Sequence, residues 1–171
     1  KAIRLGDGMS KDVDMGPIVD QEQMNSVHEG VEKAKSDPAC GKLILGGERA
    51  TEGAREKGFF YPPTVFDGVH PDSFLAQEEL FGPVLAITRV KTFEEALEAA
   101  NNCQYGLSSS IYSRNSDLIF RFLEHIETGI THVNSATMGG EAQMPFGGVK
   151  ATGVGSREMS TEGVEFFTEL K

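Results

Sequence analysis

The feature that most constrains the fold is an alternation of strand-like and helix-like segments between residues 84 and 134. Three runs rich in apolar, β-branched or small strand-forming residues predict strands: 84–90, 107–112 and 130–134. Two segments with helical spacing behind a capping residue lie between them: one to about residue 101 after Thr92, the other over about 117–126 after Asn115 or Ser116. Strands joined by helical crossovers run parallel with right-handed connections. The alternation therefore predicts an α/β fold with a mostly parallel sheet flanked by helices.

The remaining sequence adds a long helix and several short extended segments. Asp20 is a suitable N-cap for a helix over about 21–36. Short runs predict extended structure: 42–45, 59–61, 64–66 and 164–167. A glycine-rich loop is expected at 135–158, with a turn of helix at about 158–163. No linker is visible, so we expect one undivided piece of a domain.

Composition excludes several classes of function. The formal net charge of −10 argues against binding to nucleic acid or to an anionic membrane, because both require basic patches. No apolar run approaches the roughly 20 residues that span a bilayer. Cys40 and Cys103 form no CxxC pair and the histidines lack metal-binding spacing, so we expect neither a disulfide framework nor a metal site. Two reduced thiols indicate a cytoplasmic protein.

The run Glu-Glu-Leu-Phe-Gly-Pro-Val at residues 78–84 lies at the start of a predicted strand. A carboxylate at a strand edge can accept hydrogen bonds from a sugar diol, and an adjacent ring can shield a flat cofactor. The alternative is a loop that only caps the strand. The run resembles the Glu-x-Phe-Gly-Pro-Val motif of the NAD(P)-dependent aldehyde dehydrogenases. This resemblance implies that Glu79 binds the nicotinamide-side ribose and that Phe81 packs against the nicotinamide end.

A second run, Met-Pro-Phe-Gly-Gly-Val-Lys at residues 144–150, resembles the same family, in which Pro-Phe-Gly-Gly follows a strand ending in Val-Asn. The resemblance implies that Phe146 lines the aldehyde tunnel and that the loop 135–144 shapes the substrate mouth. The alternative for Phe146 is a core aromatic residue. Nothing around Lys150 in the sequence activates it, so we assign it to a backbone turn. Asn134, at the end of the predicted strand, is interpreted as structural.

The segments that carry catalysis in this family are missing. The family uses a cysteine thiolate, through a thiohemiacetal and a thioester, with a glutamate base. Its cysteine lies in a Gly-Gln-x-Cys type segment and its base in a Glu-Leu-Gly-Gly type segment, and neither occurs here. Cys40, in a helix-to-strand loop, and Cys103, at the negative end of a helix, are unsuitable replacements. The resemblance therefore implies that residues 1–171 are the C-terminal portion of an aldehyde dehydrogenase catalytic domain, without the cofactor domain and the nucleophile segment.

The resemblance further implies a full-length oxidoreductase that oxidises an aldehyde to a carboxylate with NAD or NADP. This portion alone is expected to be inactive. The implied partners are a small-molecule aldehyde, which the polar loop 135–144 suggests is polar, and further copies of the full-length protein. Two alternatives stay open: a non-catalytic binding or assembly module on the same scaffold, and a CoA-acylating semialdehyde dehydrogenase.

Overall fold

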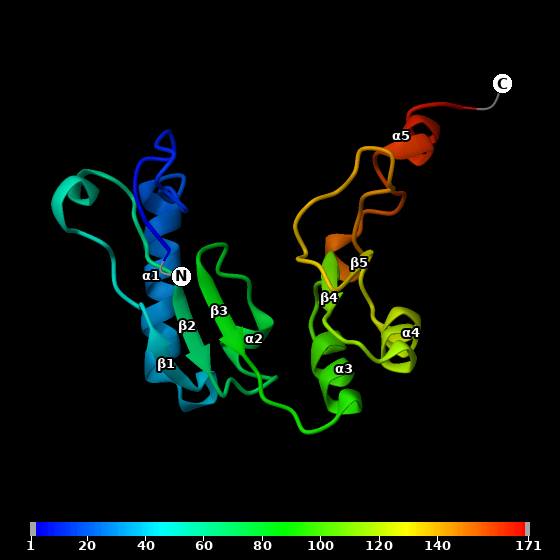
Figure 1. The fold of residues 1–171 in the computed structure, drawn as a ribbon, viewed down its shortest axis with the longest axis horizontal. Coiled ribbons are helices and arrows are strands. Elements are labelled where there is room, and N and C mark those ends of the chain that lie inside the picture. The colour runs from blue at the N-terminus through cyan, green and yellow to red at the C-terminus, as the bar shows by residue number, and fades with distance from the viewer. Residues whose placement is uncertain (1–2, 170–171) are drawn as a thin grey trace. The chain divides into compact units, whose positions relative to one another are not determined.

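The computed structural model describes residues 3–169, and the chain divides into two compact units (Figure 1). Unit 1 extends to Arg89 and unit 2 begins at Val90. That residues 1–171 are one portion of a catalytic domain stays a prediction. No glycine, proline or serine marks the boundary, so the sequence gives no local signal of it.

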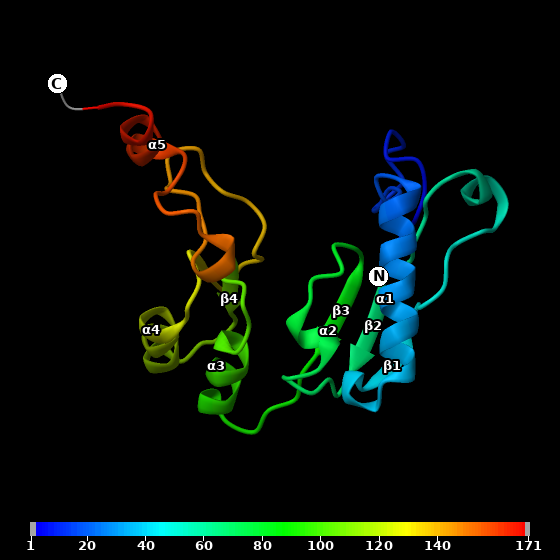
Figure 2. The ribbon, with the colours of Figure 1, turned by 180° about the vertical axis from the view of Figure 1, so that it is seen from behind.

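Unit 1 is built on a long helix and a three-stranded sheet. Its elements, in chain order, are α1 (Gln21–Ser36), η1 (Pro38–Cys40), β1 (Lys42–Leu45), η2 (Gly53–Lys57), β2 (Thr64–Asp67), α2 (Phe74–Gln77) and β3 (Val84–Ile87). Strand β2 is central, antiparallel to β1 and parallel to β3. Helix α1 covers one face of this sheet and lies in front of it in Figure 2.

The core of unit 1 explains why α1 forms where the sequence predicts it. The carboxylate of Asp20 caps the helix by accepting a hydrogen bond from the Gln23 N–H at 2.8 Å. The hydrophobic residues that α1 buries follow helical spacing: Met24, Val27, Val31 and Ala34. They form one cluster with Tyr61 and with Phe66 of β2. Each large apolar side chain buried in this way contributes about 1.5–3 kcal/mol, so this face holds α1 against the sheet.

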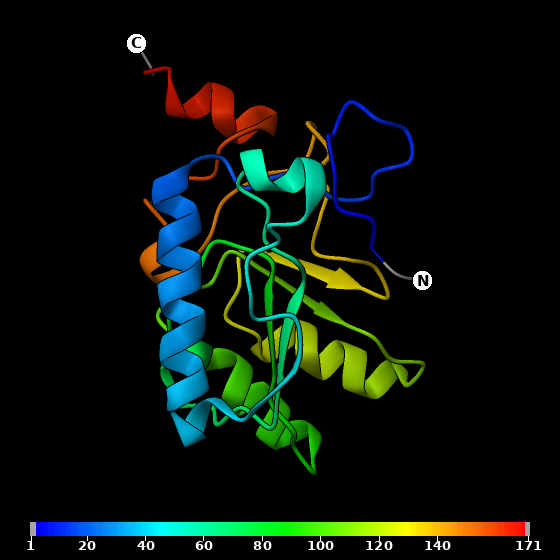
Figure 3. The same ribbon diagram turned by 90° about the vertical axis from the view of Figure 1, so that its left-hand side faces the viewer.

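Unit 2 consists of shorter elements. They are α3 (Phe93–Asn101), β4 (Ser108–Ile111), α4 (Ser116–His125), β5 (Ile130–Val133), η3 (Lys150–Thr152) and α5 (Ser160–Phe166). The predicted caps are confirmed: Thr92 Oγ1 accepts from the Glu95 N–H at 3.1 Å, and Asn115 caps α4. Strands β4 and β5 pair in parallel, side by side in Figure 3.

The α/β character is confirmed, but the expectation of a single mostly parallel sheet is wrong. The structure has a mixed three-stranded sheet in unit 1 and a parallel two-stranded sheet in unit 2. Strand β3 pairs with β2, which precedes it in the chain. The sequence does not predict this pairing, because strand pairing depends on contacts that local sequence patterns do not encode. The predicted extended segments 59–61 and 164–167 are also wrong, since the first is irregular and the second largely belongs to α5. Among residues 3–169, no helix has both the length and the apolar character needed to span a bilayer.

Candidate functional site

The loop between α2 and β3 places Glu79 and Phe81 in the wall of a surface groove. Both side chains are exposed, and Phe81 has an exposed fraction of 75%. The groove has a volume of about 480 Å³ and is lined by Leu75, Glu78, Glu79, Leu80, Phe81, Gly82, Val84 and Ala86. The Thr64 N–H of β2 donates to the Pro83 carbonyl at 2.8 Å, which fixes the end of the loop to the sheet.

Phe81 has a backbone conformation that bulky residues rarely adopt. Its φ of +41° lies in the left-handed region. Such a conformation costs about 1–3 kcal/mol and persists only where the surroundings determine it. The strained backbone carries an aromatic ring that is exposed to solvent rather than packed in the core. The backbone of this loop therefore presents the ring of Phe81 to the groove.

The lining of the groove determines what it can bind. It contains two carboxylates, Glu78 and Glu79, and no basic side chain. A carboxylate accepts hydrogen bonds from a diol and attracts a cationic ring, whereas it repels phosphate. The ring of Phe81 offers an apolar face for stacking. The lining can therefore accept a ligand that carries hydroxyl groups or a positive charge, and it is unsuited to a phosphate group.

Phe146 lies in unit 2, in the glycine-rich loop between β5 and η3. Its N–H and carbonyl pair with the backbone of Glu158 at 2.7 and 2.8 Å. The side chain has an exposed fraction of 37% and lines a hollow of about 100 Å³ beside Arg157. The guanidinium of Arg157 donates to the Gly148 carbonyl, which ties the loop to the segment after η3. The exposure of Phe146 argues against a core aromatic role within this unit.

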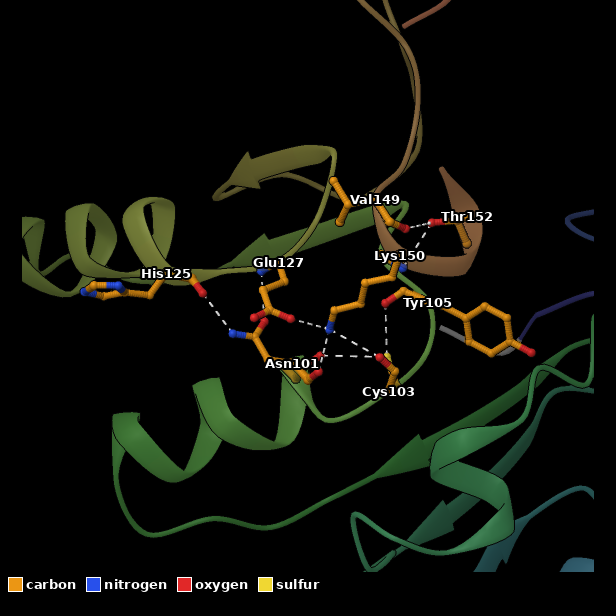
Figure 4. Close-up of polar contacts among 10 residues, drawn as sticks. Asn101, Cys103, Tyr105, His125, Glu127, Val149, Lys150 and Thr152 are labelled. Atoms are coloured by element: carbon orange, nitrogen blue, oxygen red, sulfur yellow. Dashed lines mark hydrogen bonds and ion pairs between the residues drawn. The ribbon is translucent and has the colours of Figure 1, made fainter. Parts of the chain in front are cut away.

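A cluster of contacts around Lys150 was missed by the sequence analysis (Figure 4). The Lys150 ammonium lies 2.6 Å from the carbonyl of Asn101, 3.2 Å from that of Cys103 and 2.6 Å from the Glu127 carboxylate. The two carbonyls lie at the end of α3, where the helix dipole favours a cation. Lys150 thus fastens the glycine-rich loop to the ends of two helical segments. This agrees with the interpretation that it supports a backbone turn.

Neither cysteine has the surroundings of a nucleophile within its unit. Cys40 is fully buried, and this burial raises the pKa of its thiol above the ordinary value. Its Sγ lies 3.6 Å from the Asp37 carboxylate, which disfavours a thiolate further. The Cys103 thiol donates to the Tyr105 carbonyl at 3.3 Å. Both thiols therefore have structural surroundings.

Two other polar groups are structural. The side-chain amide of Asn134 bonds both backbone groups of Ser113, each at 2.9 Å, which agrees with its structural interpretation.

Among the described residues, one group has the proximity needed to hold a metal ion: His28, Glu32 and Glu48. The ammonium of Lys35 lies 2.6 Å from each of the two carboxylates and already supplies the positive charge there.

Comparison with protein families and relatives is consistent with this geometry. The family model described as "Aldehyde dehydrogenase family" matches residues 1–171. The alpha-ketoglutaric semialdehyde dehydrogenase of Bacillus subtilis (strain 168) is 39% identical over 171 residues, which are 100% of this chain and 35% of the relative. The 2,5-dioxopentanoate dehydrogenase of Saccharolobus solfataricus is 40% identical over 172 residues, covering 100% of this chain and 34% of the relative.

Solved structures give the same assignment. Betaine aldehyde dehydrogenase from Staphylococcus aureus in complex with NAD+ has a TM-score of 0.91 at 31% identity, over 96% of this chain and 32% of that chain. The 1-pyrroline-5-carboxylate dehydrogenase from Thermus with bound NAD has a TM-score of 0.79 at 40% identity, over 86% of this chain and 27% of that chain. The chain thus spans about a third of the length of the curated relatives it matches. Because the family model matches all 171 residues, the chain belongs to the aldehyde dehydrogenase family.

Proposed function

We propose that this chain is the C-terminal portion of the catalytic domain of an NAD(P)-dependent aldehyde dehydrogenase, and that the full-length enzyme oxidises an aldehyde to a carboxylate. The observation that carries the proposal is the pairing of the exposed Glu79 carboxylate with the exposed Phe81 ring in one groove. The NAD bound in two similar solved structures supports a nicotinamide cofactor. The groove offers no group that distinguishes NAD from NADP, so both belong to the proposal.

The residues of this chain would bind and orient rather than react. Glu79 would accept hydrogen bonds from the hydroxyls of the nicotinamide-side ribose, and Phe81 would pack beside the nicotinamide end. Phe146 would form part of the aldehyde tunnel. The cofactor, when bound, accepts a hydride from the substrate. The cysteine nucleophile and the glutamate base would lie outside these 171 residues, so the chain alone would be inactive.

The substrate class has support from two sides. Three curated relatives have names that refer to alpha-ketoglutaric or alpha-ketoglutarate semialdehyde, or to 2,5-dioxopentanoate. In this chain the loop 135–144 is exposed and rich in polar and small side chains. We therefore propose a polar aldehyde, with 2,5-dioxopentanoate as the first compound to assay. Homo-oligomeric assembly and a cytoplasmic location, without nucleic-acid or membrane partners, belong to the same proposal and rest on the family resemblance, the acidic charge and the free cysteines.

The test uses the full-length protein that contains this chain. Formation of reduced cofactor is followed by absorbance with 2,5-dioxopentanoate, betaine aldehyde and an unsubstituted aldehyde, each with NAD+ and with NADP+. Aldehyde-dependent reduction supports the proposal, whereas no reduction with any pair contradicts it. Analysis of the product with and without coenzyme A separates a carboxylate product from an acyl-CoA.

Two further outcomes distinguish the alternatives. Cofactor binding without any turnover would favour a non-catalytic module on the same scaffold. The 171-residue chain alone is expected to show no reduction. If it does, and the activity is lost in Cys40→Ala or Cys103→Ala, the nucleophile lies within this chain and the proposal is wrong on that point.

A further inference from the structure

Helix α1 holds the loop 78–83 through a hydrogen-bonding side chain. The side-chain amide of Gln23 donates to the Leu80 carbonyl at 3.3 Å and to the Phe81 carbonyl at 3.1 Å. These carbonyls belong to the peptide groups on either side of the Phe81 Cα, whose φ is +41°. The amide thus fastens the loop at the point where its backbone is strained. Glu79 lies one residue before this fastened stretch.

Two close contacts with the same face of α1 fix the position of the loop 78–83. Gly82 lies so near to α1 that a Cβ there would stand 2.6 Å from Val27 Cγ2. A Cβ on Gly30 would stand 2.4 Å from a methyl carbon of Leu80, so the absence of a side chain at Gly30 makes room for Leu80. Residues 23, 27 and 30 share one helical face. Because Val27 is fully buried in the core, this face is a fixed support.

We propose that Gln23 is a positioning residue, which holds the loop 78–83 so that Glu79 and Phe81 are in place before the cofactor binds. The inference rests on the proposed function of Glu79 and Phe81. Gln23 acts through two backbone carbonyls, so its effect on the cofactor passes through the loop. A loop that is already ordered spares the binding step the entropy of ordering it.

The first experiment asks whether Gln23 holds the loop, in the 171-residue chain without any cofactor. Gln23→Leu removes both donors. Gln21→Leu is the matched control, because Gln21 is an exposed glutamine on the same helix whose side chain donates to Asn25 and makes no hydrogen bond to the loop among the described residues. The readout is the rate at which a glutamate-specific protease cleaves after Glu78 and Glu79, followed by mass spectrometry. Gln23→Leu should raise this rate about tenfold, which corresponds to about 1.4 kcal/mol, the scale of one or two hydrogen bonds. Gln21→Leu should leave the rate unchanged.

An unchanged rate in Gln23→Leu overturns the proposal. If circular dichroism shows that Gln23→Leu has lost its fold, Gln23→Glu decides instead, because an ionised carboxylate of the same length cannot donate. A second set of variants tests the contact between Gly30 and Leu80. Gly30→Ala should raise the cleavage rate, because the added methyl group displaces Leu80. Adding Leu80→Ala should reverse the part of this increase that the steric clash causes. An unchanged rate in Gly30→Ala contradicts the role of the α1 face.

The second experiment asks whether the loop matters for the cofactor, in the full-length protein. The NAD+ dissociation constant is measured for the wild type, Gln23→Leu, Glu79→Ala and the double variant. Gln23→Leu should weaken binding about tenfold when Glu79 is present and by a clearly smaller factor when Glu79 is absent, because only Phe81 is then left for the loop to position. Affinity for ADP, which lacks the nicotinamide ribose, should be the same in all four proteins.

Two results would overturn the role in binding. Equal losses with and without Glu79 would mean that Gln23 acts independently of it, by direct contact or by general destabilisation. No loss in Glu79→Ala itself would refute the proposed function of Glu79, and with it the role of Gln23 in positioning Glu79 for the cofactor. The cleavage rates would still show whether Gln23 holds the loop, so the two failures are distinguishable.

Discussion

Unit 1 and unit 2 each present one candidate loop, and they hold it by different means. Among the described residues, ten of the eleven buried hydrophobic residues lie in unit 1, where a packed helix supports the loop 78–83. The remaining one, Phe122, is the single buried hydrophobic residue in the described part of unit 2. There the glycine-rich loop is held by backbone hydrogen bonds, such as those that the Gly106 carbonyl accepts from Gly129 and Val149 at 3.0 and 2.9 Å.

In unit 2, backbone segments approach each other closely where unit 1 packs side chains. A Cβ on Gly129 would lie 1.9 Å from the Gly147 carbonyl oxygen, next to Phe146. A hydrophobic core loses stability when atoms are removed, whereas a contact between backbones loses stability when atoms are added. The core of unit 1 should therefore lose stability when its side chains are truncated, whereas the contact between Gly129 and Gly147 in unit 2 should lose stability when a methyl group is added.

The largest effect is expected from Phe66→Ala in unit 1. Phe66 is fully buried in β2, so its truncation should lower the free energy of unfolding by about 3–5 kcal/mol. Urea denaturation followed by circular dichroism measures this loss. Phe120→Ala is the control, because Phe120 is 70% exposed on α4 and its truncation should have little effect. A loss below about 1 kcal/mol in Phe66→Ala would mean that unit 1 has no such core.

Lys150→Met should give the next largest loss. The substitution keeps the length of the side chain and leaves the carbonyls of Asn101 and Cys103 without their shared donor. Hydrogen bonds to a charged group contribute about 1.5–3 kcal/mol, and we expect a loss of stability in this range by the same denaturation. Lys91→Met, at an exposed lysine of the same unit, serves as the control. Equal stability of the two variants would show that the Lys150 cluster does not hold unit 2 together.

Gly129→Ala tests the backbone contact in unit 2 directly. The added methyl group must push the Gly147 peptide away, which should cost about 1–3 kcal/mol. Gly140→Ala is the matched control, because a Cβ there meets nothing nearer than a Phe146 ring carbon at 3.8 Å. Measured stability that does not distinguish the two alanines would remove the contrast between the units.

A smaller effect concerns the pH dependence of unit 1. Burial raises the pKa of Tyr61 to about 12, above the ordinary value of about 10. Because the folded pKa is the higher one, the neutral phenol stabilises the fold fully below pH 10, and this contribution is lost as pH rises from 10 to 12. By pH 11 the wild type should lose about 1.4 kcal/mol more than Tyr61→Phe. Tyr112→Phe, at a residue that is 69% exposed, should follow the wild type, and parallel curves for all three proteins would refute the prediction.

The sequence predicted the features that depend on neighbouring residues. The helices α1, α3 and α4 were located from their caps and apolar spacing, both of which are local. The division after Arg89 and the pairing of β3 with β2 were not predicted, because they depend on contacts between distant segments. The run around Glu79 was found by its resemblance to a motif. The supports at Gln23 and Lys150 were not, since their partners lie 57 and 49 residues away in the sequence.

The central claim is that Glu79 is the ribose ligand of an aldehyde dehydrogenase. The most direct test is the NAD+ dissociation constant of the full-length protein, measured by calorimetry for the wild type, Glu79→Gln and Glu78→Gln. Glu78 is the neighbouring exposed carboxylate in the same groove, so it controls for the loss of charge. Loss of the charged acceptor should weaken binding about 10- to 100-fold in Glu79→Gln, a clearly larger loss than in Glu78→Gln, which removes a charge from the groove but not the ribose acceptor. Equal affinity in the wild type and Glu79→Gln would contradict the claim.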